Sequence, residues 1–273
     1  MFRYITAFMK KEALWLVRHK AQMTFELLLP ITGIIPVLIY TAYILSQSDI
    51  SSFAAITGTE QYFEFFCISI VFTIFSIIQE QTGNVLANEM WMGTLEQIWM
   101  APVPKTFLMF GWLSIGLVKA VLNCIISLAI LYAVFFFGRV SFTIYNVPLL
   151  LFSILLLMAI SFAIGMVICS ISLKLKQADA IIFFITGLIP IICGASYPIT
   201  VLPQIIQIVA KLLPTTYAYD LIRHAFINTT TIFPIAVELV VLCVQTLIMI
   251  GIAIGIYKRV CRRVEECGTI YLM

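Results

Sequence analysis

Charged, metal-binding and catalytic residue types are scarce in this sequence. Only 11% of its 273 residues are Asp, Glu, Lys or Arg, against about 25% in an ordinary soluble domain. Two histidines are present, and the seven cysteines include no C-x-x-C pair. We therefore expect no catalytic residues and no metal site. A net charge of only +3 gives no reason to expect nucleic-acid binding.

A nucleotide-binding loop is also missing. The pattern G-x-x-x-x-G-K-[ST], whose backbone amides hold the phosphates of ATP, does not occur anywhere in the sequence. Any process that this chain drives with ATP must therefore draw on a separate subunit. The chain itself is not expected to be an enzyme, and no cofactor is expected in it.

Long apolar runs are what the sequence has in abundance, since 62% of the residues are hydrophobic. About 20 apolar residues in a helix cross the hydrocarbon core of a bilayer. The candidate spans cover residues 23–45, 62–78, 107–137, 147–173, 180–194 and 232–257. The sequence thus predicts an all-α polytopic membrane protein, with a six-span domain over residues 23–257.

Basic residues between and around these runs predict the orientation, because short cytoplasmic loops are rich in Lys and Arg. The loop over residues 46–61 contains none, whereas Lys174 and Lys176 lie between the fourth and fifth spans. The basic residues that flank the spans at the two ends are Arg3, Lys10, Lys11, Arg18, Lys20, Lys258, Arg259, Arg262 and Arg263. Both termini, including the tail 258–273, are predicted to be cytoplasmic in a cell membrane.

Residues 1–22 have an amphipathic pattern. On a helix, Arg3, Lys10, Lys11 and Arg18 gather on one side, and apolar residues such as Phe2 lie on another. This pattern is typical of a helix that lies in the membrane surface with its basic face toward lipid headgroups. The alternative is a cytoplasmic extension of the first span.

Residues 88–101, on the predicted cytoplasmic side, form a second amphipathic stretch. It has an apolar face with aromatic side chains and a few polar side chains beside it, and two prolines follow. The residues concerned are Glu89, Trp91, Met92, Gly93, Thr94, Leu95, Glu96, Gln97, Ile98 and Trp99. A short helix with aromatic anchors suits docking into a groove of a partner protein. The alternative is an interfacial helix that rests on lipid alone.

Residues 196–228 lie between the last two spans and contain prolines and charged residues. Pro203 fits the first turn of a helix and Pro214 its end. A second helix can then start, capped by Thr215 or Thr216. We interpret the stretch as two short re-entrant helices that enter the outer leaflet and return. A folded external cap on the membrane is the alternative.

A few charges lie within or near the spans, where an ionisable group is a functional hypothesis by default. Lys119 lies inside the third span and either reaches back to the inner interface or pairs with Glu26 of the first span. Glu64 and Glu238 lie near the outer ends of their spans, where we expect them to meet water.

Two motifs resemble a known family. The first runs from Gly194 through Pro198 and Leu202-Pro203 to "LLPTTYAYDLIR", which ends at Arg223. The second is "NEMWMGTLEQIWMAP", with Glu89 and Gly93-Thr94-Leu95-Glu96. The second motif precedes the first along the chain, and the two lie on opposite sides of the predicted membrane. In this arrangement they are similar to motifs of permease subunits of type-2 ATP-binding-cassette (ABC) exporters. Leu213 and Thr215 depart from the usual Asn and Leu.

The resemblance implies a transport function. Residues 88–101 would be the coupling helix, held in a cleft of an ATP-binding subunit that carries ATP and Mg²⁺. Two permeases, identical or different, would form the pathway for an amphiphilic substrate such as a drug, a lipid, a lipid-linked glycan or a hydrophobic peptide. The exit or re-entrant region would include Pro198, Pro203, Pro214, Tyr217, Tyr219 and Arg223.

Two other classes of function remain open. A secondary transporter should show paired broken helices in two repeated halves, but only one broken region follows from this sequence, after the fifth span. A membrane-embedded scaffold or assembly protein, or an embedded enzyme, should carry clustered His, Asp or Glu at membrane depth, and no such cluster occurs in the sequence.

Overall fold

The computed structural model shows a bundle of helices. It describes residues 62–100, 105–135, 145–175, 179–195, 199 and 202–267, together with Lys10, Lys11, Leu14, Arg18, Lys20 and Thr24. The helices of these ranges are α4 (Tyr62–Trp91), α5 (Leu95–Met100), α6 (Lys105–Phe135), α7 (Val147–Leu175), α8 (Asp179–Ile192), α9 (Gln204–Leu212), α10 (Pro214–Ile227) and α11 (Ile235–Cys267). No strand occurs in the described ranges, as the predicted all-α class requires.

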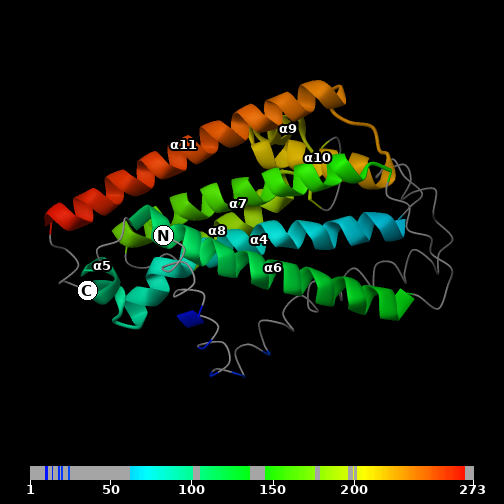
Figure 1. The fold of residues 1–273 in the computed structure, drawn as a ribbon. Helices are drawn as coiled ribbons and strands as arrows, with labels where there is room; N and C mark the ends of the chain where they lie inside the picture. The colour runs from blue at the N-terminus through cyan, green and yellow to red at the C-terminus, as the bar shows by residue number, and fades with distance from the viewer. Residues whose placement is uncertain are drawn as a thin grey trace.

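Helix α7 lies at the centre of the bundle, with α4, α10 and α11 packed against it and α6 on the far side of α4 (Figure 1). The central helix is the more buried one: 61% of the apolar stretch Val147–Lys174 in α7 is buried, against 17% of Ile235–Glu266 in α11. The outer helices therefore leave long apolar faces uncovered, which suits contact with lipid.

Three helices are long and apolar enough to cross a membrane, over Met109–Ile126, Val147–Lys174 and Ile235–Glu266. They lie within α6, α7 and α11, where the third, fourth and sixth spans were predicted. Helix α8 has 14 residues, or about 21 Å at 1.5 Å per residue, which is short for a hydrocarbon core of about 30 Å. Apart from Thr24, the predicted first span lies outside the described residues, and the count of six stays a prediction.

Small residues let α4 and α7 approach closely. A Cβ placed on Gly165 of α7 would lie 2.6 Å from the Cβ of Thr82 on α4, and one on Gly83 would lie 2.9 Å from Cγ2 of Ile168. Two buried apolar clusters flank this crossing. One centres on Phe72, Phe75 and Tyr219; the other includes Leu86, Met109, Trp112, Cys169 and Tyr257.

Candidate functional site

The stretch predicted as one helix, residues 88–101, is instead an elbow between two helices. Helix α4 continues to Trp91, and α5 begins at Leu95. Gly93 between them has φ +66°, a left-handed conformation that glycine adopts without steric cost. The N–H of Gly93 donates to Met90 O and the N–H of Thr94 to Glu89 O, both at 3.1 Å. These two bonds form a Schellman motif, which ends α4.

Glu89 holds the elbow from inside. Its carboxylate accepts hydrogen bonds from the hydroxyl of Thr94 and from the ammonium of Lys11, and the side chain is nearly fully buried. One carboxylate thus connects α4, the start of α5 and the N-terminal region. Because its oxygens are used internally, Glu89 does not provide the polar contact to a partner that the sequence suggested.

The elbow exposes large apolar side chains together with polar ones. Trp91 is 79% exposed, Met100 71% and Met92 49%. The polar side chains of Glu96 and Gln97 are also exposed. Large apolar side chains that gather on one surface mark an interaction site. The exposed aromatic side chain is therefore Trp91, and Met100 at the end of α5 is exposed as well.

The other predicted anchors face inward. Leu95 is buried, and Ile98 and Trp99 are half-buried against the cluster around Leu86 and Met109. The ammonium of Lys105 lies 5.3 Å from the centre of the Trp99 ring and donates to Trp99 O. These contacts fix α5 against the end of α4 and the start of α6, so a movement of α5 would be passed to both helices.

At the other end of the bundle, α9 and α10 occupy the region predicted to be re-entrant. Pro203 is the N-cap of α9, and Pro214 is the first residue of α10 rather than only the end of α9. The caps expected at Thr215 and Thr216 are wrong: Leu213 occupies the N-cap position, with no side-chain bond. Thr215 instead donates to Cys193 Sγ at 2.8 Å. Pro198 lies outside the described residues.

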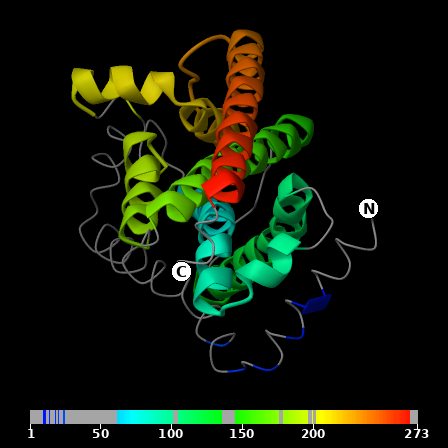
Figure 2. The same cartoon turned by 90° about the vertical axis from the view of Figure 1, so that its left-hand side faces the viewer.

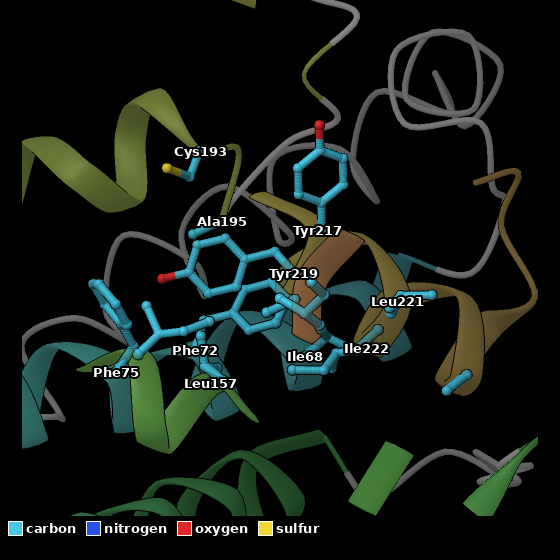
Figure 3. Close-up of a cluster of buried hydrophobic side chains, with 14 of the residues drawn as sticks. Ile68, Phe72, Phe75, Leu157, Cys193, Ala195, Tyr217, Tyr219, Leu221 and Ile222 are labelled. Carbon is cyan, nitrogen blue, oxygen red and sulfur yellow. The ribbon is translucent and has the colours of Figure 1, made fainter. Parts of the chain in front are cut away.

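Helix α10 is a core helix rather than a surface one. Tyr219 is 1% exposed, and its ring centre lies 4.2 Å from that of Phe72. Figure 3 shows the Tyr219 ring among Phe72, Phe75 and Leu157, whereas the hydroxyl of Tyr217 points away from them. The expectation that Tyr219 lines an exit is therefore wrong, because its ring is packed inside the bundle.

Tyr217 and Arg223 are also tied down. The hydroxyl of Tyr217 donates to Lys211 O at 2.7 Å, which links α10 to α9. Arg223 is buried, and its Nη2 donates to Gly194 O at 2.7 Å, just past the end of α8. A cation at a helix C-terminus satisfies carbonyl groups that lack intrahelical partners. Arg223 thus fastens α10 to the short helix α8.

A comparison with protein families matches the chain over residues 46–254, more than half of its length, to the family described as ABC-2 family transporter protein. The chain belongs to this family. It is therefore the permease subunit of an ABC transporter, a membrane component that relies on an ATP-binding-cassette partner. No curated protein matches the chain in a sequence comparison.

Within this permease, the structure gives Lys119 a partner other than the one considered from sequence. Its ammonium donates to Gln81 Oε1 at 3.1 Å, from α6 to α4. Glu26 lies outside the described residues, so the proposed Lys119–Glu26 pair stays a prediction.

The structure contradicts the prediction that Glu238 meets water. Glu238 lies in the first turn of α11 and is fully buried, where water was expected. Glu238 is buried because α10, a separate helix, packs against α11. A pattern within residues 232–257 contains no signal for that contact.

Proposed function

We propose that this permease exports an amphiphilic substrate across the cell membrane, and that the α4–α5 elbow transmits the movement of the ATP-binding subunit. The observation that carries the proposal is the division of the elbow into two faces. Its outer face exposes Trp91, Met92 and Met100, while Glu89 and Trp99 tie its inner face to the helix bundle.

The position of the elbow supports a cytoplasmic location. The hydroxyl of Tyr257 in α11 lies 3.4 Å from Lys105 O at the start of α6, so the basic end of α11 lies beside the elbow. Lys258, Arg259, Arg262 and Arg263 follow directly. Basic residues of this kind mark the cytoplasmic side, which is where ATP is available.

The composition of the spans supports an amphiphilic substrate. The chain contains 21 Phe and 11 Tyr, and such side chains offer apolar and aromatic contacts to a substrate that also partitions into lipid. Drugs, lipids, lipid-linked glycans and hydrophobic peptides share this chemistry. A pathway between two permeases, identical or different, completes the proposed transporter, with ATP and Mg²⁺ bound on the ATPase subunits.

The test is co-purification of the permease with its ATPase from native membranes. The variant Trp91→Ala plus Met100→Ala should lose the ATPase, because a few buried aromatic and apolar anchors dominate interface energies. Its own thermal stability should stay unchanged, since both side chains are exposed. The matched control is Leu212→Ala, 78% exposed on α9, which should retain the ATPase.

ATP hydrolysis by the reconstituted complex then tests the transport function. Amphiphiles should stimulate hydrolysis in the native complex and in the control variant. If the native permease purifies without any nucleotide-hydrolysing partner, the elbow is not a coupling surface, and a secondary transporter or a membrane scaffold becomes the better interpretation.

A further inference from the structure

Glu238 has an environment that a carboxylate does not tolerate. Its side chain has no exposed surface, and neither carboxyl oxygen has a hydrogen-bond donor among the described residues. The N–H of Phe233 approaches it without normal hydrogen-bond geometry. A buried, ionised carboxyl group without donors is strongly disfavoured. Glu238 must therefore be neutral or share its charge.

Its neighbour is a second carboxyl group, Asp220 of α10. The two carboxyl groups lie within hydrogen-bonding reach of each other. Burial of Asp220 disfavours its ionised form, but Asp220 has contacts that stabilise a negative charge and that Glu238 lacks. Its Oδ2 accepts the N–H of Ile232 at 2.9 Å, and the side chains of Arg223 and His224 lie close enough to interact with it electrostatically. Two ionised carboxylates in contact repel each other strongly.

We propose that Asp220 and Glu238 hold one proton between them, with Glu238 as the acid and Asp220 as the carboxylate. The O–H of Glu238 then donates to an oxygen of Asp220. This arrangement satisfies Glu238, which otherwise has no donor, and leaves one negative charge on the pair, opposite Arg223. The pair is a proton-binding site at the end of the bundle away from the α4–α5 elbow (Figure 1).

The shared proton also has a mechanical role, because the two residues lie on different elements. Asp220 belongs to α10, which is fastened to the end of α8 by Arg223. Glu238 belongs to the first turn of α11, one of the long apolar helices. The pair therefore joins α11 to the α8–α10 unit. Figure 2 shows α10 beside the start of α11, with α9 extending sideways from them.

The charges that face the pair determine its response to pH. On α10 they are Arg223 and His224, with the phenol of Tyr217 near Glu238. Helix α9, which also packs against α10, carries Lys211 in its last turn. As pH rises, the proton leaves, two carboxylates face each other, and the link weakens. The link therefore weakens as pH rises through the titration of the pair.

Infrared difference spectroscopy of the whole permease in lipid nanodiscs tests the proposal. The native protein should show the C=O band of a protonated carboxylic acid at neutral pH, and the band should disappear on alkaline titration. The band should be absent from Glu238→Gln and absent or shifted in Asp220→Asn. The control Glu265→Gln, an exposed residue of the same helix, should retain the native band.

Thermal unfolding in the same nanodiscs provides a second measurement. The native Tm should fall by about 2–4 °C at alkaline pH, as expected for the loss of about one hydrogen bond in a chain of this size. In Glu238→Gln this fall should vanish, because the amide N–H still donates to Asp220 and does not titrate.

Three results would overturn the proposal. The first is the absence of a protonated-acid band at neutral pH in the native protein. The second is a band that persists unchanged in Glu238→Gln. The third is a rise of the native Tm with Ca²⁺ or Mn²⁺ that Glu238→Gln abolishes, because the pair would then hold a metal ion rather than a proton. None of these results depends on the ATPase partner, so they leave the proposed transport function untouched.

Discussion

Single polar side chains connect the helices of this permease at points where apolar packing alone does not specify which helices meet. Glu89 joins α4 to Thr94 and Lys11, and Arg223 joins α10 to the end of α8. Lys119 joins α6 to α4 through Gln81. In a bundle whose partners are lipid tails, apolar side chains gain little by choosing one neighbour over another. The polar contacts therefore specify which helices meet.

Tyr219 is a buried aromatic residue whose hydroxyl has no hydrogen-bond partner among the described residues. Because a buried unpaired polar group is costly, Tyr219→Phe should leave the free energy of unfolding unchanged or raise it by about 1 kcal/mol. Tyr219→Ala should lower it by about 3–5 kcal/mol, since it leaves a cavity beside Phe72 and Phe75. Thermal unfolding in detergent checks both changes. A strong loss of stability in Tyr219→Phe would mean that the hydroxyl has an essential partner.

At the scale of elements, the elbow depends on one glycine conformation. In Gly93→Ala, a Cβ is forced into the left-handed region, which should cost about 1–2 kcal/mol. We expect a lower Tm and weaker coupling of ATP hydrolysis to transport. Gly93→Asn should lose less, because Asn tolerates this conformation better than other residues. The ratio of transport to hydrolysis in proteoliposomes measures the coupling; equal effects of Ala and Asn would contradict the conformational argument.

The crossing of α4 and α7 depends on a second glycine, Gly165. In Gly165→Ala, the new Cβ would lie 2.6 Å from the Cβ of Thr82, so the two helices must separate. Overpacking of this kind costs about 1–3 kcal/mol, and we expect a corresponding loss of thermal stability. Gly187→Ala on α8 is the control, because no atom lies within 4 Å of its added Cβ; its stability should not fall. Similar losses in the two variants would contradict the packing argument.

At the scale of the whole molecule, the proposed orientation places the elbow and the basic end of α11 in the cytoplasm. Single cysteines introduced as Glu96→Cys and Glu265→Cys, in a background without the natural cysteines, should react with a membrane-impermeant thiol reagent only after the membrane is opened. Leu212→Cys, at the opposite end of the bundle, should react from outside in intact cells. The reverse pattern would invert the topology and separate the elbow from cytoplasmic ATP.

Much of the fold could be predicted from the sequence because apolar length is a local property. The stretches 107–137 and 147–173 coincide closely with α6 and α7, whereas α11 continues to Cys267, beyond the predicted span 232–257. The elbow was harder to predict. Gly93 was visible as a signal for a helix end, yet the amphipathic pattern on both sides of it favoured one continuous helix over residues 88–101. The inward burial of Glu89 and the outward exposure of Trp91 could not be read from the pattern.

By itself, the sequence determined the environment, the helical class and the family of this protein. Hydrophobic runs and the two motifs are local features of the sequence, so they can be recognised without knowing how the helices pack. Only the tertiary structure decided which polar groups are buried. Asp220 and Glu238 are separated by a turn and lie on different helices, and their contact depends on how α10 packs against α11. Burial and charge pairing are properties of that packing, because they depend on which surfaces from distant segments exclude water.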